Sequence, residues 1–310
     1  MLTSRAIIAA KVESAYNTDA SPAPGTDDIL VQDLSTGLAE GARMQEQPYV
    51  RPSLGTKPHL YGGSLMQLQF TVPIKGSGTS GEAPEWGVLM KGCGFAETVN
   101  ADTDVQYAPA SDGHESLTIY YWQDGHQYKL TGARGNLSLT GNAGETGKLQ
   151  FTFTGHVTGP IDQPLPSSPA FDATEAPIVK GASMTVGGDT LEIAALSLDV
   201  GNEIATPADI SANDGYGEIL ITRRDINGSI DPKAVLVATH DLIGKWRSGT
   251  SEAINTGEVG GTAGNRWKLE MPKCRYREPS QGDRSGVLTH EMTFGAHEDA
   301  GDDEAVLTLT

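Results

Sequence analysis

The stretch GNAGETGKLQFTFTGH, Gly141 to His156, contains a Thr-Gly-Lys triplet after small residues, as phosphate-binding loops do. The pattern fails where nucleotide chemistry needs it. Asn142 stands at the first glycine position, and Leu149 follows Lys148, so the hydroxyl group that would hold Mg²⁺ is missing. Leu149 and the two phenylalanines after it alternate with polar residues, as in a half-buried strand. We therefore interpret the stretch as a β-hairpin.

Two other segments resemble catalytic or calcium-binding loops. GDRSG, Gly282 to Gly286, is superficially similar to a serine-nucleophile loop, but its flanks offer no defensible nucleophile geometry. HEDAGDDE, His297 to Glu304, holds five carboxylates without the alternating ligand order of a calcium loop. We interpret the first as a turn and the second as a solvated acidic loop.

Three histidines, His114, His126 and His156, lie in the same part of the sequence as Asp112 and Asp124. Their spacing is neither H-x-H nor H-E-x-x-H, so a metal site is not favoured. A hydrolase that uses the His and Asp residues of this region is a weak alternative. The sequence thus predicts no catalytic, cofactor-binding or metal-binding residue, no cofactor, and a protein that is not an enzyme.

The charge balance argues against binding to nucleic acid. The 310-residue chain has 22 Lys and Arg against 40 Asp and Glu, a net charge of −18. DNA binding depends on basic residues that displace counterions from phosphates, so an acidic chain repels DNA instead. We expect Arg134, Arg223 and Arg224 to pair with carboxylates on a neighbouring strand or subunit.

Composition favours many short strands. The chain has 38 glycines and only 6% aromatic residues. The apolar run Ala6 to Ala10 is too short for a signal-peptide core, and no apolar run of about 18 residues occurs. Cys93 and Cys274 lie far apart and show no metal-type spacing. We therefore expect a soluble protein made in the cytoplasm.

The order of expected elements recurs along the chain. Strands over 28–36 and 64–74 precede a helix within 81–95 and antiparallel strands over 116–156. Strands over 189–201 and 217–226 likewise precede a helix over 231–246, with Asp231 as N-cap and Pro232 in the first turn, and then further strands. An ungapped offset of 139 residues aligns the two hairpins. This repetition predicts a tandem duplication.

The predicted organisation is a first domain over residues 1–158 with an N-terminal arm, a linker over 159–178, and a second domain over 179–310. The linker, GPIDQPLPSSPAFDATEAPI, holds five prolines and has no periodicity. The fold class is mainly β, with two tandem β-sandwich or barrel domains that each carry one flanking α-helix.

Several stretches resemble the tail tube (major tail) proteins of long-tailed, non-contractile bacteriophages, the siphophages with Mu-like structural genes. The start AAKVESAYNTDASPAPGTDDILV, the helix PEWGVLMKGCGFAETV and the block YYWQDGHQYKLTGARG, followed by a strand that ends in FTG, are similar to that family. The similarity is good over roughly residues 5–170 and weaker afterwards, where LSLDVGNEI matches best. The turn GETGK departs from the expected pattern.

The resemblance implies a structural virion protein that self-assembles into stacked rings and forms the conduit for DNA ejection. Two domains per chain imply homotrimeric, pseudo-hexameric rings. The implied partners are other copies of the chain and the tape measure, terminator and tip proteins of the tail. The genome would pass through a carboxylate-lined lumen without specific binding, and no membrane is involved. We expect the loops over 37–63 and 202–215 to make ring-to-ring contacts.

The alternative function is a two-domain β-sandwich adhesin or decoration module that binds a surface glycan. Such a module usually exposes a cluster of aromatic side chains on one face. The four tryptophans are instead dispersed over different helix and strand candidates. The tail tube is therefore the preferred interpretation.

Overall fold

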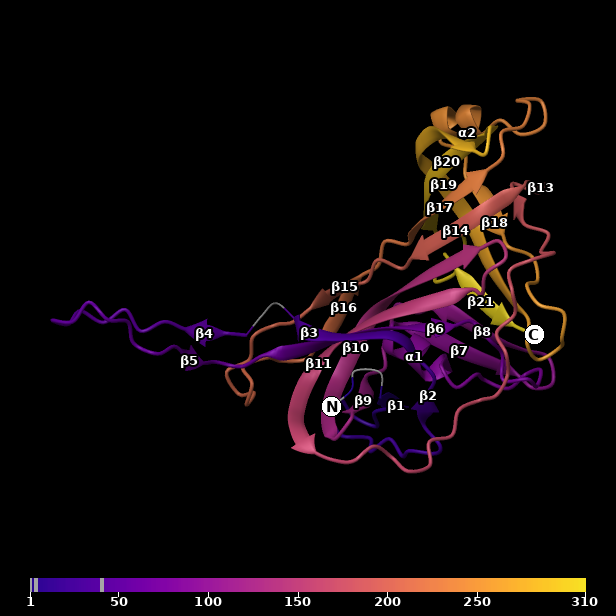
Figure 1. The fold of residues 1–310 in the computed structure, drawn as a ribbon. Coiled ribbons are helices and arrows are strands. Elements are labelled where there is room, and N and C mark those ends of the chain that lie inside the picture. Colours follow the sequence, from indigo (N-terminus) through magenta and orange to yellow (C-terminus); the bar gives the residue numbers. More distant parts are fainter. Residues whose placement is uncertain (1, 3–4, 40–41) are drawn as a thin grey trace.

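The computed structural model of the chain describes residues 2, 5–39 and 42–310, and its described residues fold mainly as β-strands with short helices, as predicted (Figure 1). None of the helices among these residues is long and apolar enough to cross a membrane.

The strands of the first half include two that run well beyond the average strand length, β10 and β11, which form the hairpin predicted from the alternation at Leu149. The strands are β1 (Ala6–Val12), β2 (Asp28–Ile29), β3 (Gln32–Ala39), β4 (Met44–Gln45), β5 (Leu60–Tyr61), β6 (Leu65–Pro73), β7 (Phe95–Asn100), β8 (Asp104–Pro109), β9 (Leu117–Gln123), β10 (His126–Asn142) and β11 (Lys148–Asp162).

The strands of the second half again include one long hairpin, β19 with β20, whose turn carries the GDRSG segment. These strands are β12 (Thr185–Val186), β13 (Asp189–Thr190), β14 (Ile193–Asp199), β15 (Glu203–Ala205), β16 (Leu220–Arg223), β17 (Asn227–Pro232), β18 (Glu252–Asn255), β19 (Trp267–Arg284), β20 (Val287–His297) and β21 (Val306–Leu309).

Within the described residues, each half carries one short helix, as expected, but the second begins later than predicted. Helix α1 (Gly87–Gly92) lies within the predicted range. Helix α2 (Leu242–Ser248) starts after Asp241, whose side chain accepts a hydrogen bond from the Gly244 amide, and it ends at Gly249 in the left-handed conformation. The prediction that Asp231 caps this helix is wrong, because residues 231–232 end strand β17.

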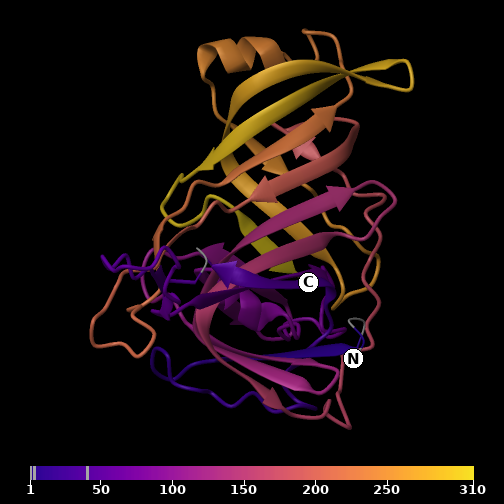
Figure 2. The ribbon, with the colours of Figure 1, turned by 60° about the vertical axis from the view of Figure 1, so that its left-hand side comes forward.

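The strands of both halves join in one sheet (Figure 2). Among the described residues, eight strands follow one another in the order β3-β6-β11-β10-β14-β17-β20-β19, and every neighbouring pair is antiparallel. Strands β9, β1 and β2 extend from the first part of β10. Strands β18, β12 and β13, and separately β21, β8 and β7, extend from β19.

The pairing order repeats between the halves, which supports the expected duplication. The first half contains β3-β6-β11-β10-β9, and the second contains β14-β17-β20-β19-β18 in the same relative chain order. The last pair of each series, β10 with β9 and β19 with β18, also contains a bulge of the same form. Between the pairs Leu117↔Ala133 and Ile119↔Leu130, the long strand has two intervening residues and the short strand has one, so the long strand carries one extra residue.

The same bulge lies between Glu252↔Cys274 and Ile254↔Met271. It therefore matches Ala133 of β10 with Cys274 of β19, an offset of 141 residues. The sequence comparison aligned these strands with an offset of 139. The sequence alignment is therefore shifted by two residues, and a shift of two keeps the alternation of core-facing and outward-facing side chains.

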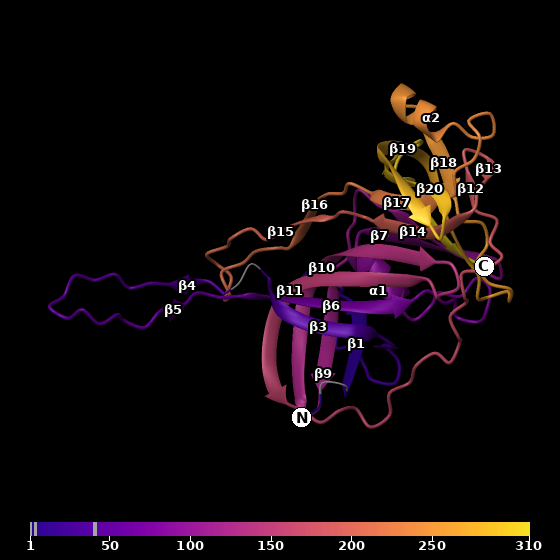
Figure 3. The ribbon, with the colours of Figure 1, turned by 45° about the horizontal axis from the view of Figure 1, so that its top comes forward.

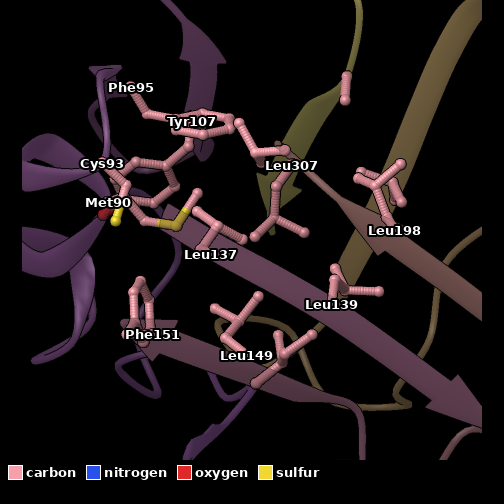
Figure 4. Packing of buried hydrophobic residues seen from close by; sticks show 14 of the residues in the cluster. Met90, Cys93, Phe95, Tyr107, Leu137, Leu139, Leu149, Phe151, Leu198 and Leu307 are labelled. Atoms are coloured by element: carbon pink, nitrogen blue, oxygen red, sulfur yellow. The ribbon is translucent and has the colours of Figure 1, made fainter. Parts of the chain in front are cut away.

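One hydrophobic core extends through both halves. Leu137 and Phe151 of the first half belong to the same buried cluster as Leu198 and Leu307 of the second (Figure 4). The Pro-rich segment between the halves is anchored to this body by a buried lysine. The Lys75 side chain is only 2% exposed, and its Nζ lies 3.1 Å from Glu85 Oε1 and 2.7 Å from the carbonyl oxygen of Asp172.

Candidate functional surfaces

The residues that resembled a phosphate-binding loop lie in a hairpin turn. Lys148 opens strand β11 and faces Thr140 of β10 across the ladder, so its amide does not start a helix. The hairpin interpretation is therefore confirmed. In the second half, Ser285 of the GDRSG segment lies at the corresponding turn with a φ of 55°.

The three histidines do not come together. His114 Nε2 lies 2.9 Å from the carbonyl oxygen of Ala110, and His126 Nε2 lies 3.8 Å from Asp162. His156 lies in strand β11, and its ring nitrogens face Tyr16 and Asp214 instead. Within the described part of the chain, no group of three or more His, Cys, Asp or Glu side chains is placed to hold a metal ion.

His156 belongs to a chain of hydrogen bonds that joins three segments. Its Nε2 lies 3.0 Å from the hydroxyl of Tyr16, its Nδ1 lies 2.6 Å from Asp214 Oδ2, and the amide of Ile219 donates to the same tyrosine hydroxyl at 2.7 Å. Burial raises the pKa of Tyr16 to about 12. The arrangement connects the N-terminal segment and the first hairpin with the loop that follows β15.

Arg134 and Arg224 pair with carboxylates, as expected, whereas no ion pair of Arg223 is found among the described residues. Arg134 Nη1 lies 2.8 Å from Glu218 Oε1. Arg224 pairs with Asp302 and Glu304 of the acidic loop and donates to the carbonyl oxygen of Ala110 in the first half. Hydrogen bonds from Ser111 and Arg224 lower the pKa of Asp302. The acidic loop therefore fastens the C-terminal segment to the first half.

The eight-stranded sheet has one apolar and one polar face. Phe151, Leu137 and Leu198 point into the core. The opposite face is formed by cross-strand rows of hydroxyl and amide side chains. The rows, read across the strands, are Ser35, Gln69, Thr152, Asn136; then Thr71, Gln150, Ser138, Asp199, Asn227; then Lys148, Thr140, Ser197, Ser229, Thr293, Glu278. We call this the polar face.

The polar face carries charges of both signs. Lys148, Asp199 and Glu278 belong to these rows. Beside them, Arg277 covers Gly295, which is opposite Asn227, and Glu291 is opposite Ser280. The Asp199 carboxylate accepts a hydrogen bond of 2.8 Å from the Asn136 side chain, so part of its hydrogen-bonding capacity is used within the chain. The polar face therefore combines hydroxyl and amide groups with charges of both signs.

A long arm projects from the first half. It comprises residues 42–63, with the short β4–β5 pair near its base (Figures 1 and 3). Residues 40 and 41, which belong to the predicted 37–63 loop, lie outside the described residues. Val50 and Leu54 of the arm are fully exposed, and Tyr49 is 64% exposed. Such apolar exposure on an extended segment is typical of a surface that a partner covers.

The base of the arm is held by the second half. Arg43 donates to the carbonyl oxygen of Gly215 at 2.8 Å and lies over the ring of Tyr216 at 3.7 Å. Gly63, with φ +112°, approaches Asp214 so closely that a Cβ atom would lie 1.9 Å from its carbonyl oxygen. The predicted counterpart loop, 202–215, thus packs beside the arm's base.

The two ends of the eight-stranded sheet are open edges. Among the described residues, β3 pairs only with β6, so one side of β3 has no strand partner. Residues 277–284 of β19 pair with β20 on one side and have no strand on the other. Exposed edges of this length attract further strands, which monomeric proteins usually prevent.

Two open edges, a continuous polar face and a projecting apolar arm define a structural subunit that joins copies of itself. The comparison with known families agrees with this class. The family described as "Phage tail tube protein" matches residues 3–296, so the chain belongs to the phage tail tube proteins. It is a structural protein of the virion tail that self-assembles into the tube through which DNA is ejected. No curated protein matches the chain.

Proposed function

We propose that three copies of the chain form each ring and that the two halves of every chain give the ring pseudo-sixfold symmetry. The repeated pairing order β3-β6-β11-β10-β9 and β14-β17-β20-β19-β18 carries this proposal. Two equivalent units in one chain occupy two equivalent positions around an axis, because each unit can make the same lateral contact.

The polar face lines the channel in this ring. The core face of the sheet is already covered by the chain's own side chains, so only the polar face is free to bound a lumen. Its hydroxyl and amide groups differ from the carboxylate lining that we expected from the net charge. A wall in which hydroxyl and amide groups separate charges of both signs lets DNA pass, because it has no continuous positive stripe that would bind phosphates.

The arm contacts the neighbouring ring along the tube. Its exposed Val50 and Leu54 are covered only when another molecule approaches, and the arm extends well beyond the body of the protein, in line with β3 and β6 (Figure 3). The tape measure, terminator and tip proteins are then partners at the ends and in the lumen of the tube, in line with the family.

Electron microscopy of the assembled protein tests the proposal. End-on class averages should show hollow rings with three repeats, each divided into two similar lobes. Replacement of Leu54 by Asp should stop stacking but leave single rings, because the fully exposed side chain makes no contact that the fold needs. Rings of six separate chains would contradict the proposed stoichiometry. Tubes of Leu54→Asp as long as those of the unchanged protein would contradict the role of the arm.

A further inference from the structure

We propose that the chain forms an amide bond within itself, between Nζ of Lys75 and the side-chain carboxyl carbon of Asp172, with Glu85 as the proton carrier. The ion pair seen in the structure is the state before this reaction. The bond ties the Pro-rich segment 159–178 covalently to the first half. This inference goes beyond the proposed tube and does not depend on it.

The amine of Lys75 is held away from water and beside one carboxyl group. The side chain is 2% exposed. The backbone carbonyl oxygen of Lys75 accepts a hydrogen bond of 2.9 Å from the indole of Trp86, which is fully buried. At the other end, the Lys75 Nζ donates to the backbone carbonyl oxygen of Asp172 at 2.7 Å. Contacts at both ends therefore fix this side chain next to Asp172.

The carboxyl group of Asp172 is arranged as an electrophile. Its Oδ1 accepts two hydrogen bonds, one from the Thr174 amide at 2.9 Å and one from the Thr174 hydroxyl at 2.8 Å. Two donors on one oxygen stabilise the negative charge that gathers there when a nucleophile attacks the carboxyl carbon. Oδ1 is therefore the oxygen that stays in the amide.

The other oxygen of Asp172 is suited to leave. Oδ2 is buried, accepts no hydrogen bond among the described residues, and lies 3.7 Å from the Lys75 Nζ. An ion pair that serves only as an anchor usually brings a carboxylate oxygen within hydrogen-bond distance of the ammonium group. In this site the ammonium group donates to the backbone oxygen of Asp172 instead, which leaves Oδ2 without a donor.

Glu85 lies where a proton carrier is needed. Its Oε1 is 3.1 Å from the Lys75 Nζ, and its Oε2 accepts a hydrogen bond of 2.9 Å from the Asp172 amide. One carboxylate thus contacts both reacting residues. Oε1 otherwise meets only the Leu30 amide, at 3.5 Å, so neither oxygen of Glu85 has the paired donors found on Asp172. The contrast favours Glu85 as the base and Asp172 as the acceptor.

The reaction balances without another reactant. Glu85 takes a proton from the ammonium group, and the nitrogen lone pair forms a bond to the Asp172 Cγ. Two protons pass in turn from the nitrogen through Glu85 to Oδ2. The Cγ–Oδ2 bond breaks with its electron pair on the oxygen, and one water molecule leaves. One positive and one negative charge disappear, and Glu85 returns to its starting form.

The fold supplies the driving conditions for this step. Groups that are held together in one site react as if they were present at a very high concentration. A site shielded from water also favours the neutral amide over two buried charges. Asp172 keeps 24% exposure, so the released water molecule has a path to the solvent.

Mass spectrometry of the full chain tests the proposal. Purified, unassembled protein is kept near neutral pH and sampled over several days, and it should lose the mass of one water molecule. Proteolysis should then release a branched peptide that joins Lys75 to Asp172, located by fragmentation. Lys233 and Glu192 are the internal control, because they are 2.9 Å apart but 43% and 73% exposed. These two residues should remain in separate peptides.

Two variants test the assigned roles. Glu85→Gln keeps the size of the side chain but cannot take the proton, so this variant should keep its full mass. Thr174→Val removes one of the two donors on Oδ1 and should slow the loss of water by roughly tenfold to a hundredfold. Circular dichroism compares the folding of both variants with that of the unchanged protein. If Glu85→Gln does not fold, the rate for Thr174→Val carries the test.

The outcomes separate this inference from the proposed function. Full mass at every time point overturns the amide bond. A loss of water that maps to Lys75 with Glu85, or to another part of the chain, overturns the assigned acceptor. Equal rates for the unchanged protein and both variants overturn the roles of Glu85 and Thr174. Because the mass is measured on unassembled chains, a failure to form tubes contradicts the proposed function alone.

Discussion

The buried Lys75 offers a sharp test of how the Pro-rich segment is fastened to the first half. Its side chain is 2% exposed, while Glu85 and Asp172 around it keep 12% and 24% exposure. Lys75→Met keeps most of the apolar stem and removes the ammonium group. The two carboxylates then lose their counter-charge in a partly buried site.

Removal of one partner from a buried ion pair typically costs about 3–5 kcal/mol. Because both carboxylates retain some contact with water, we expect a somewhat smaller loss, about 2–4 kcal/mol. For a chain of this size, that corresponds to a fall in Tm of roughly 3–6 °C. Protease cleavage within 159–178 should also become faster, because the Lys75 Nζ no longer holds the carbonyl oxygen of Asp172.

The matched control is Lys233→Met. Lys233 and Glu192 are 2.9 Å apart, but they are 43% and 73% exposed, so this exchange should cost less than about 1 kcal/mol. The double variant Lys75→Met with Glu85→Gln should recover part of the loss, because it leaves less unpaired charge. Thermal melting by circular dichroism gives the comparison. If Lys75→Met lowers Tm no more than Lys233→Met does, the reasoning is refuted.

Two further predictions concern the arm's base and the acidic loop. Gly63→Ala should destabilise the protein more than Gly144→Ala, because only at Gly63 does an added Cβ meet the Asp214 carbonyl oxygen. Gly144→Ala is the control and should cost about 1–2 kcal/mol for its positive φ alone. Comparative melting and proteolysis of the arm measure the difference. Since the folded pKa of Asp302 is depressed, its contribution to stability is present above its ordinary pKa of 3.8 and is lost as the pH falls through the lowered value, so hydrogen exchange of residues 297–305 should accelerate there. Asp302→Asn should weaken that pH dependence without removing it, because the pKa of Asp303 in the same loop is also lowered, by hydrogen bonds from the Asp299 and Ala300 amides. An unchanged profile would show that the pairing with Arg224 does not hold the loop.

The sequence was most informative where the pattern is local. The alternation that starts at Leu149 correctly predicts a strand, since a period of two reports which side chains face a core. The second helix was misplaced because Asp231 and Pro232 satisfy the rules for a helix start equally well at the end of a strand. The later signal, Asp241 with Gly249 at the end, marks the helix that forms.

The candidate surfaces depend on which strands become neighbours, and local patterns do not carry that information. Ser138 and Asp199 lie opposite each other although they are 61 positions apart, and nothing near either residue specifies its partner. The polar face was therefore visible only as separate Ser, Thr and Gln residues on several strands. The open edges were likewise not predictable, because an edge is defined by a missing neighbour.

The arm belongs to only one of the two repeated units. In the proposed ring, lateral joints occur at every half-chain, whereas axial joints occur once per chain. A ring thus has three equivalent ways to seat on the ring below, and a rotation by one half-chain brings each arm over a unit of the other kind. The duplication therefore gives the tube a definite rotational registry, which a ring of six identical units could not encode.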